Sequence, residues 1–213
     1  MTRPSPTEVM ADPRARLAVG LAGLLATAGA VRRDHVDAWE GTAFRAVNGL
    51  PDALYRPAWS VMQMGAFGAV PATAAAAWRA GDGELAARLL LGGTGAWACA
   101  KLVKQVVRRP RPVALLPGTR GRGREAAGLG YLSGHAAVAV ALGVAALPGL
   151  GPAARALTLS AMPLVGLTRV YVGAHLPLDI AGGAALGLAA DAAAGLALAR
   201  TWGAPGRKTR ISR

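Results

Sequence analysis

Long apolar stretches separated by short charged segments make up most of this chain. Two stretches of at least 18 residues contain no charged side chain, 58–78 and 136–154. A run of that length is typical of a helix that crosses a membrane. Four further apolar stretches are shorter or contain one or two charges: 17–31, 89–107, 156–172 and 176–199. The pattern predicts an all-α bundle of six transmembrane helices.

Two tryptophans lie at the ends of the stretch 58–78. Trp59 and Trp78 are 19 residues apart, which in a helix of about 1.5 Å rise per residue spans about 28 Å, close to the hydrocarbon thickness of a bilayer. They fit an aromatic belt at the two membrane interfaces. The alternative is a pair of ordinary core tryptophans.

The N-terminal part allows two interpretations. Ala28-Gly29-Ala30 resembles the cleavage site of a signal peptide, but charged residues flank the apolar stretch on both sides and favour an uncleaved helix. Residues 34–57 mix acids, apolar residues and two prolines, which predicts an amphipathic helix and a turn at the membrane surface. We expect one membrane domain over 1–213, divided into an N-terminal part (1–57), a core (58–200) and a basic cytoplasmic tail (201–213).

Composition narrows the class of protein. Hydrophobic residues make up 53% of the chain and charged residues 16%, yet 24 Lys and Arg against 11 Asp and Glu give a net charge of +13. An ordinary soluble domain has about 25% charged residues, and a disordered basic tail has few apolar ones. A membrane protein with basic loops and ends fits better. The single cysteine, Cys99, excludes an intramolecular disulfide.

Polar residues gather at one end of the expected bundle. Because consecutive spans alternate in direction, the ends of the third and fifth and the starts of the fourth and sixth share one membrane face. The residues at these ends are Lys101, Lys104, Ser133, His135, Arg169, His175 and Asp179. Ionisable groups inside spans are costly and indicate a functional site. Singly, the lysines are explained as well by snorkelling to the headgroups and His135 as an interfacial histidine.

His175 and Asp179 stand four residues apart. In a helix this spacing puts both side chains on one face. The carboxylate then holds the imidazole in one tautomer and stabilises its charged form.

The loop between the third and fourth spans is rich in arginine. Its members are Arg108, Arg109, Arg111, Arg120, Arg122 and Arg124. Such a run binds phosphate groups bidentately or attracts anionic lipid headgroups. A loop between membrane helices is a poor platform for a nucleic-acid duplex, so we expect no nucleic-acid partner.

These groups suit phosphoryl transfer. A phosphatase needs positive charge around the phosphate, an in-line nucleophile and an acid for the leaving oxygen. Lys104, Arg111 and Arg169 supply charge, and one histidine attacks while the other donates a proton. Ser133 and Gly134 offer a hydroxyl and backbone N–H groups at a helix N-terminus. No carboxylate cluster suits a pair of Mg²⁺ ions, so we expect neither metal nor cofactor.

The order and spacing of these residues resemble a known three-part signature. The parts are Lys104-x6-Arg111-Pro112, Leu132-Ser133-Gly134-His135 and Arg169-x5-His175-x3-Asp179. They resemble the type 2 phosphatidic acid phosphatase family, whose relatives include polyprenyl diphosphate phosphatases and the soluble vanadium haloperoxidases. The resemblance extends over about 58–200. The chain departs from the family pattern at Leu132, where the family usually has Pro, and at Thr168, where it often has Ser.

The resemblance implies a role for each residue. His175 attacks phosphorus and forms a phosphohistidine, Asp179 orients it, and His135 protonates the leaving group. The phosphate oxygens are held by Lys104, Arg111, Ser133, Gly134 and Arg169. Asp191 matches no motif position; it either pairs within the bundle or lines a cavity.

The family also implies a cell-membrane, multi-pass location, an active site on the outer face and cytoplasmic termini. We expect a lipid phosphate or diphosphate as substrate, of polyprenyl or phosphatidate type. Phosphatidylglycerol phosphate remains an alternative, as does the role of a non-enzymatic transporter or structural protein. The sequence leaves the oligomeric state open.

Overall fold

The computed structural model describes residues 12–31, 34–124 and 127–202. This part of the chain is all-helical and contains no strand, which confirms the predicted class. The α-helices are α2 (Pro13–Ala30), α3 (Ala38–Asn48), α4 (Tyr55–Met62), α5 (Ala69–Arg79), α6 (Gly83–Val107), α7 (Pro112–Leu115), α8 (Gly134–Ala146), α9 (Pro152–Tyr171) and α10 (Pro177–Trp202). Most of the predicted tail, 203–213, lies outside the described residues.

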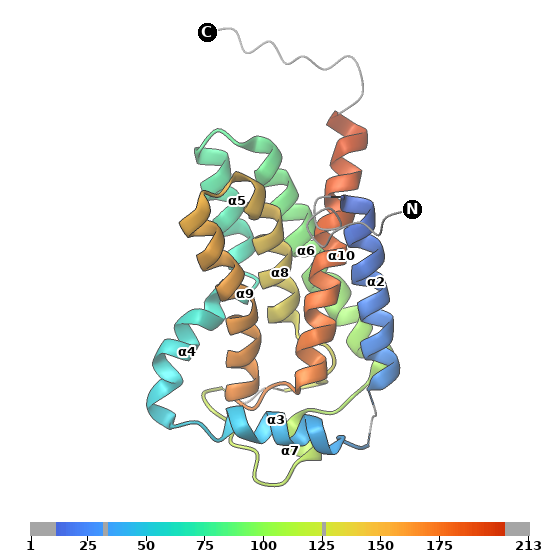
Figure 1. Cartoon of the computed structure of the whole chain (residues 1–213), viewed down its shortest axis with the longest axis vertical. Helices are drawn as coiled ribbons and strands as arrows, with labels where there is room; N and C mark the ends of the chain where they lie inside the picture. Colours follow the sequence, from blue (N-terminus) through green and yellow to red (C-terminus); the bar gives the residue numbers. More distant parts are fainter. Residues whose placement is uncertain (1–11, 32–33, 125–126, 203–213) are drawn as a thin grey trace, which may run out of the picture.

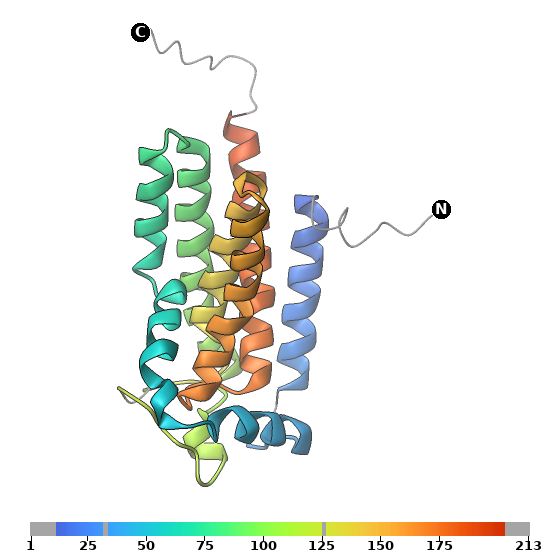
Figure 2. The same cartoon turned by 60° about the vertical axis from the view of Figure 1, so that its left-hand side comes forward.

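The long helices run side by side, and α3 and α7 lie across one end of the bundle (Figures 1 and 2). α10 is central because it packs against α2, α6 and α8. Glycines permit this approach: a Cβ at Gly183 would collide with the Ser133 carbonyl oxygen, and one at Gly187 with that of Ala137. The two ends that begin α8 and α10 are thereby held together.

The prediction of one helix over 58–78 is wrong. α4 ends at Met62, a 3₁₀ turn follows at Gln63–Gly65, and α5 begins at Ala69. Gly65 lies against the backbone of His135, so that a Cβ there would stand 2.5 Å from the His135 carbonyl oxygen. At this break the backbone of Gly65 packs directly against the start of α8. A residue with a side chain at position 65 would not fit there.

Trp59 and Trp78 are not core residues. Their exposed fractions are 49% and 71%, so the alternative of two buried tryptophans fails. Trp59 belongs to α4 and Trp78 to α5.

The helix predicted over 136–154 also ends earlier than predicted. α8 stops at Ala146 and a 3₁₀ turn spans Leu147–Gly149. Pro152 then begins α9, because proline suits the first turn of a helix, where its missing N–H has no partner to lose. Hydropathy alone does not mark this boundary, since Pro and Gly interrupt the helix without adding charge.

Judged by length and apolar composition, one helix of the described chain suffices to cross a membrane, Pro177–Thr201, and Gly134–Gly149 is apolar but shorter. Six membrane-length spans are therefore not confirmed, in part because α4, α5 and α8 have 8, 11 and 13 residues and are shorter than the predicted stretches.

Asp191 pairs within the bundle. Its carboxylate is fully buried and accepts hydrogen bonds from Arg88 Nε at 2.7 Å and Nη2 at 2.8 Å. Arg16 Nη2 lies 3.6 Å from the same carboxylate. The three residues belong to α10, α6 and α2, so the ion pairs join three helices of the bundle.

Candidate active site

The predicted convergence of helix ends is present. Lys104 lies in the last turn of α6, which ends where Arg108 takes a left-handed φ of 56°. Arg169 lies in the last turn of α9, and Asp179 in the first turn of α10. Ser133 immediately precedes α8 and donates its N–H to the Asp179 carbonyl oxygen at 2.9 Å.

Ser133 is the N-cap of α8. Its Oγ accepts a hydrogen bond from Ala136 N at 3.4 Å, and the residue is fully buried. Gly134 and His135 are the first two residues of the helix. Their N–H groups belong to the helix terminus that carries the positive end of the dipole, an environment that favours an anion.

Asp179 is fixed by the start of α10. Pro177 is the first residue of that helix, and Asp179 Oδ2 reaches back to accept a hydrogen bond from Leu176 N at 2.9 Å. The same oxygen lies 3.4 Å from His175 Nδ1. The predicted His175–Asp179 pair is therefore formed, and both side chains are buried. The two residues do not share a helix face as predicted, because α10 begins at Pro177 and His175 lies in the segment before it.

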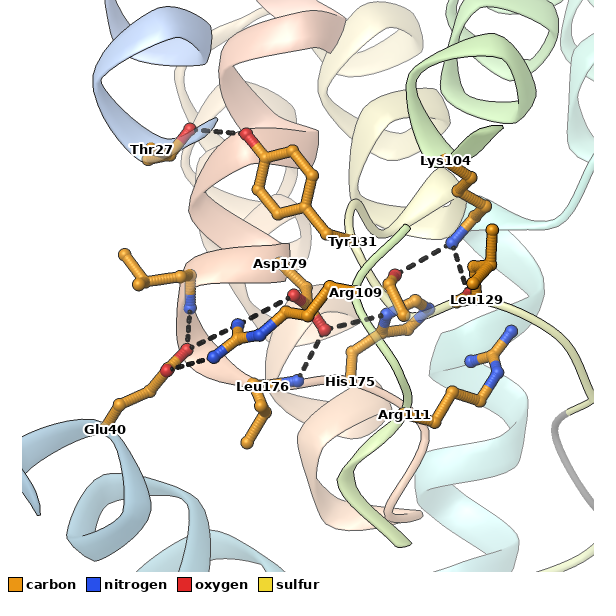
Figure 3. Close-up of polar contacts among 12 residues, drawn as sticks. Thr27, Glu40, Lys104, Arg109, Arg111, Leu129, Tyr131, His175, Leu176 and Asp179 are labelled. Atoms are coloured by element: carbon orange, nitrogen blue, oxygen red, sulfur yellow. Dashed lines mark hydrogen bonds and ion pairs between the residues drawn. The ribbon is translucent and has the colours of Figure 1, made fainter. Parts of the chain in front are cut away.

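Lys104 and Arg111 lie on the opposite side of His175 from Asp179 in Figure 3. Lys104 Nζ donates to the Leu129 and Gly130 carbonyl oxygens at 3.1 and 2.8 Å. Arg111 donates from Nε to Ala127 O at 3.0 Å and from Nη1 to Ala174 O at 2.8 Å. Lys104 and Arg111 thus hold the loop before α8, and Arg111 also holds the residue before His175. Each side chain has further N–H groups that can donate to a ligand.

Arg169 has weaker partners. Its Nη1 lies 3.0 Å from the sulfur of Met62, a poor acceptor, and its buried Nε has no hydrogen-bond partner within the described chain. A buried guanidinium normally pairs with an anion. This donor set therefore fits an oxyanion better than it fits its present surroundings.

The electrostatic environment of His175 is positive. Burial lowers the pKa of its imidazole well below the ordinary value. Nearby groups that act in the same direction are, in decreasing order, Lys104, Arg169, Arg111 and His135. His175 is thus a neutral base beside cations, and because Nδ1 faces Asp179, Nε2 is the nitrogen left for chemistry.

Two other basic residues named in the sequence analysis, Lys101 at a helix end and Arg122 in the arginine-rich loop, have partners of their own. Lys101 stacks on Trp97, with Nζ 3.6 Å from the ring centroid. Arg122 donates to Asp52 at 2.8 Å and to Tyr171 O at 2.6 Å, so its donors hold the loop together. The arginine-rich run is therefore not one phosphate-binding surface.

Sequence reasoning missed Glu40 and assigned Arg109 only to the arginine-rich loop, whereas the structure places Arg109 in a buried ion-pair network. Arg109 is 1% exposed and ion-pairs with Glu40 and Asp179. Glu40 lies on the buried face of α3, four residues before buried Phe44 and eight before buried Asn48. An acid at helical spacing with buried residues is the signal that could have revealed it.

No group of three or more His, Cys, Asp or Glu in the described segments is arranged to hold a metal ion.

The chain matches the sequence model of one known protein family. The sequence model of the PAP2 superfamily matches residues 85–201, more than half of the chain. The protein belongs to the PAP2 superfamily, whose phosphatases are hydrolases of phosphate esters. No curated protein sequence gives a match.

Two solved structures have a similar fold. LpxE of Aquifex aeolicus is 21% identical and superposes with a TM-score of 0.70, covering 78% of this chain and 99% of its own. A transmembrane PAP2-type phosphatidylglycerolphosphate phosphatase of Bacillus subtilis is 22% identical with a TM-score of 0.66, covering 92% and 99%. At these identities the likeness shows the shared fold.

Proposed function

We propose that this protein is a multi-pass membrane phosphatase that removes phosphate from a lipid phosphate or diphosphate without a metal ion, through a phosphohistidine at His175. One arrangement carries the proposal: His175, paired with the Asp179 carboxylate, lies beside a group of cationic side chains. One of these cations, Arg169, has no anionic partner in the described chain. This combines a nucleophile with an oxyanion site.

The reaction proceeds in two displacements. His175 Nε2 attacks phosphorus, the bond from phosphorus to the leaving oxygen breaks, and His135 gives its proton to that oxygen. Lys104, Arg111 and Arg169 stabilise the charge on the three equatorial oxygens, together with Ser133 and the Gly134 N–H. Water then attacks the phosphohistidine, His135 takes its proton, and inorganic phosphate leaves.

Asp179 has two tasks in this scheme. It holds Nδ1–H, which presents Nε2 to the phosphorus, and its negative charge stabilises the cationic imidazole of the phosphoenzyme. The 3.4 Å contact with Nδ1 is long for a hydrogen bond, and we expect it to shorten as the ring becomes positive.

A membrane location is supported by the exposed apolar surface. Leu25, Leu102 and Leu157, on α2, α6 and α9, are 73%, 67% and 72% exposed. Such large apolar side chains on three helices suit lipid better than water. We infer six spans with the active site on the outer face and both termini in the cytoplasm.

The position of the site at the end of the bundle indicates the class of substrate. A lipid whose phosphate lies in the headgroup layer brings that group to the helix ends while its tail stays in the bilayer. Polyprenyl phosphates or diphosphates and phosphatidate are the leading candidates. Phosphatidylglycerol phosphate belongs beside them because one similar structure is a phosphatase for that lipid.

The test is phosphate release by purified protein in detergent with EDTA present, on a panel of these lipids compared by kcat/KM. We expect turnover of at least one lipid, with inhibition by vanadate, which mimics the pentacoordinate phosphoryl state. Inactivity on the whole panel would favour a non-enzymatic membrane protein, and full dependence on added metal would contradict the proposed mechanism.

A further inference from the structure

A buried ion-pair network stands behind the His175–Asp179 pair. Arg109 Nη1 donates to Glu40 Oε1 and to Asp179 Oδ1, each at 3.1 Å, and Nη2 donates to Glu40 Oε2 (Figure 3). Glu40 and Arg109 are each 1% exposed and Asp179 is fully buried. The arginine is therefore shared between a carboxylate of α3 and the catalytic carboxylate of α10.

We propose that Glu40 and Arg109 are positioning residues that set the orientation and the charge of Asp179 for the reaction at His175. This inference rests on the proposed function of the site. It assigns part of the catalytic arrangement to α3, which lies before the region matched by the family, residues 85–201.

The orientation argument follows from the two oxygens of Asp179. Oδ1 is held by Arg109, whereas Oδ2 faces Leu176 N and His175 Nδ1. With Oδ1 fixed, rotation of the carboxylate away from the imidazole requires breaking a buried hydrogen bond to a charged group, which is among the stronger kinds. Arg109 thus directs one oxygen to His175.

Glu40 fixes the position of Arg109 from the other side. Besides its two bonds with the guanidinium, Glu40 Oε1 accepts a hydrogen bond from Leu178 N at 2.9 Å. That N–H lies in the first turn of α10, where a negative group is favourable. Glu40 therefore ties the arginine to the same helix start that carries Asp179.

The charge argument concerns how much negative charge reaches His175. Burial opposes the charge of Arg109, but the hydrogen bond and charge of Glu40 and those of Asp179 raise the pKa of Arg109, so it stays cationic. Two carboxylates and one guanidinium leave one net negative charge. Without Glu40, Arg109 would neutralise Asp179, and less charge would stabilise the imidazolium of the phosphoenzyme.

The direct test is Glu40→Gln, with Glu84→Gln as control because Glu84 is an exposed acid in the first turn of α6. We expect Glu40→Gln to lower kcat by about 10- to 100-fold, the size of effect seen when a reacting group is misplaced. KM should stay within about twofold, since the phosphate ligands are untouched. Wild-type kcat in a folded Glu40→Gln protein would overturn the proposal.

A second variant covers failure to fold. Glu40→Gln leaves Arg109 with one carboxylate, that of Asp179, whereas Glu40→Gln with Arg109→Met removes both members of the Glu40–Arg109 pair. Asp179 then keeps Leu176 N and His175 Nδ1 as its partners. We expect the double variant to keep a reduced kcat with a KM near wild type. Recovery of wild-type kcat in it would show that the pair serves folding alone.

The proposal is also measurable without substrate. In protein labelled with ¹⁵N-histidine, Glu40→Gln should shift the His175 ring signals, identified by their loss in His175→Gln, while Glu84→Gln leaves them unchanged. If the wild type fails to hydrolyse any lipid phosphate, the proposed function is wrong, and this measurement still decides the positioning role. Unshifted signals in Glu40→Gln would contradict it.

Discussion

Arg88 and Asp191 join α6 to α10 through two hydrogen bonds of 2.7 and 2.8 Å. The Arg88 side chain is 19% exposed and the Asp191 carboxylate is fully buried. Asp191 is twelve residues after Asp179, about 18 Å along the helix. This ion pair therefore belongs to the bundle and not to the candidate active site.

Asp191→Asn should destabilise the fold without changing the chemistry. Removing one partner of a buried ion pair costs about 3–5 kcal/mol, because the remaining charge loses its counter-ion. We expect a lower apparent Tm in detergent and an unchanged kcat for the folded fraction. Asp34→Asn, at an exposed position, is the control for both measurements. A Tm equal to that of wild type would show that the pair contributes little.

Lys101 and Lys104 provide a matched test of the phosphate site. Both are on α6, but Lys104 lies beside His175 and Lys101 stacks on Trp97. Lys104→Gln should lower kcat/KM about 10²- to 10³-fold, as loss of one oxyanion donor does in other enzymes. Lys101→Gln should retain activity. Equal effects in kinetic assays would indicate that both lysines serve only as membrane anchors.

The contact between α8 and α10 should matter for stability and activity alike. A side chain at Gly187 meets the Ala137 carbonyl, so Gly187→Val forces the helices apart at a cost of about 1–3 kcal/mol. Because these helices carry His135 and Asp179, kcat should fall as well. Gly95→Ala, where no atom lies within 4 Å of the new Cβ, is the control. Thermal unfolding and kinetics of both variants check the expectation.

The pH dependence of stability follows from His175. Its folded-state pKa lies below the ordinary 6.5, so between these values the unfolded chain binds a proton that the folded protein does not. The contribution to stability is present above pH 6.5 and is lost as the pH falls through that window. We expect His175→Gln to flatten the decline of apparent Tm below pH 6.5. Replacing His35, whose side chain is 67% exposed, should leave the decline as it is.

The sequence was sufficient to predict an all-helical fold and the meeting of helix ends, because apolar run length and alternating direction are local and topological properties. It did not predict the break at Gln63–Gly65, because composition carries no information about the close approach of Gly65 to α8. Hydropathy also did not predict that α8 ends at Ala146, because the proline and glycine that follow end the helix without adding charge.

Arg109 and Arg111 show why site residues are harder to predict than elements. They are two positions apart in one loop and equal in chemistry, yet one is buried against Glu40 and the other lies beside His175. What separates them is a carboxylate 69 residues earlier in the chain. Only the fold brings that group to Arg109.

The most direct test of the mechanism is capture of the phosphoenzyme. Wild-type protein mixed with ³²P-labelled lipid phosphate and quenched in alkali should carry label that is stable to alkali, labile to acid and located at His175 by mass spectrometry of the peptide. His175→Asn should carry no label and should lose turnover by about 10³-fold or more. Turnover of the His175→Asn variant at the wild-type rate, or label on another residue, would contradict the assignment of His175 as the nucleophile.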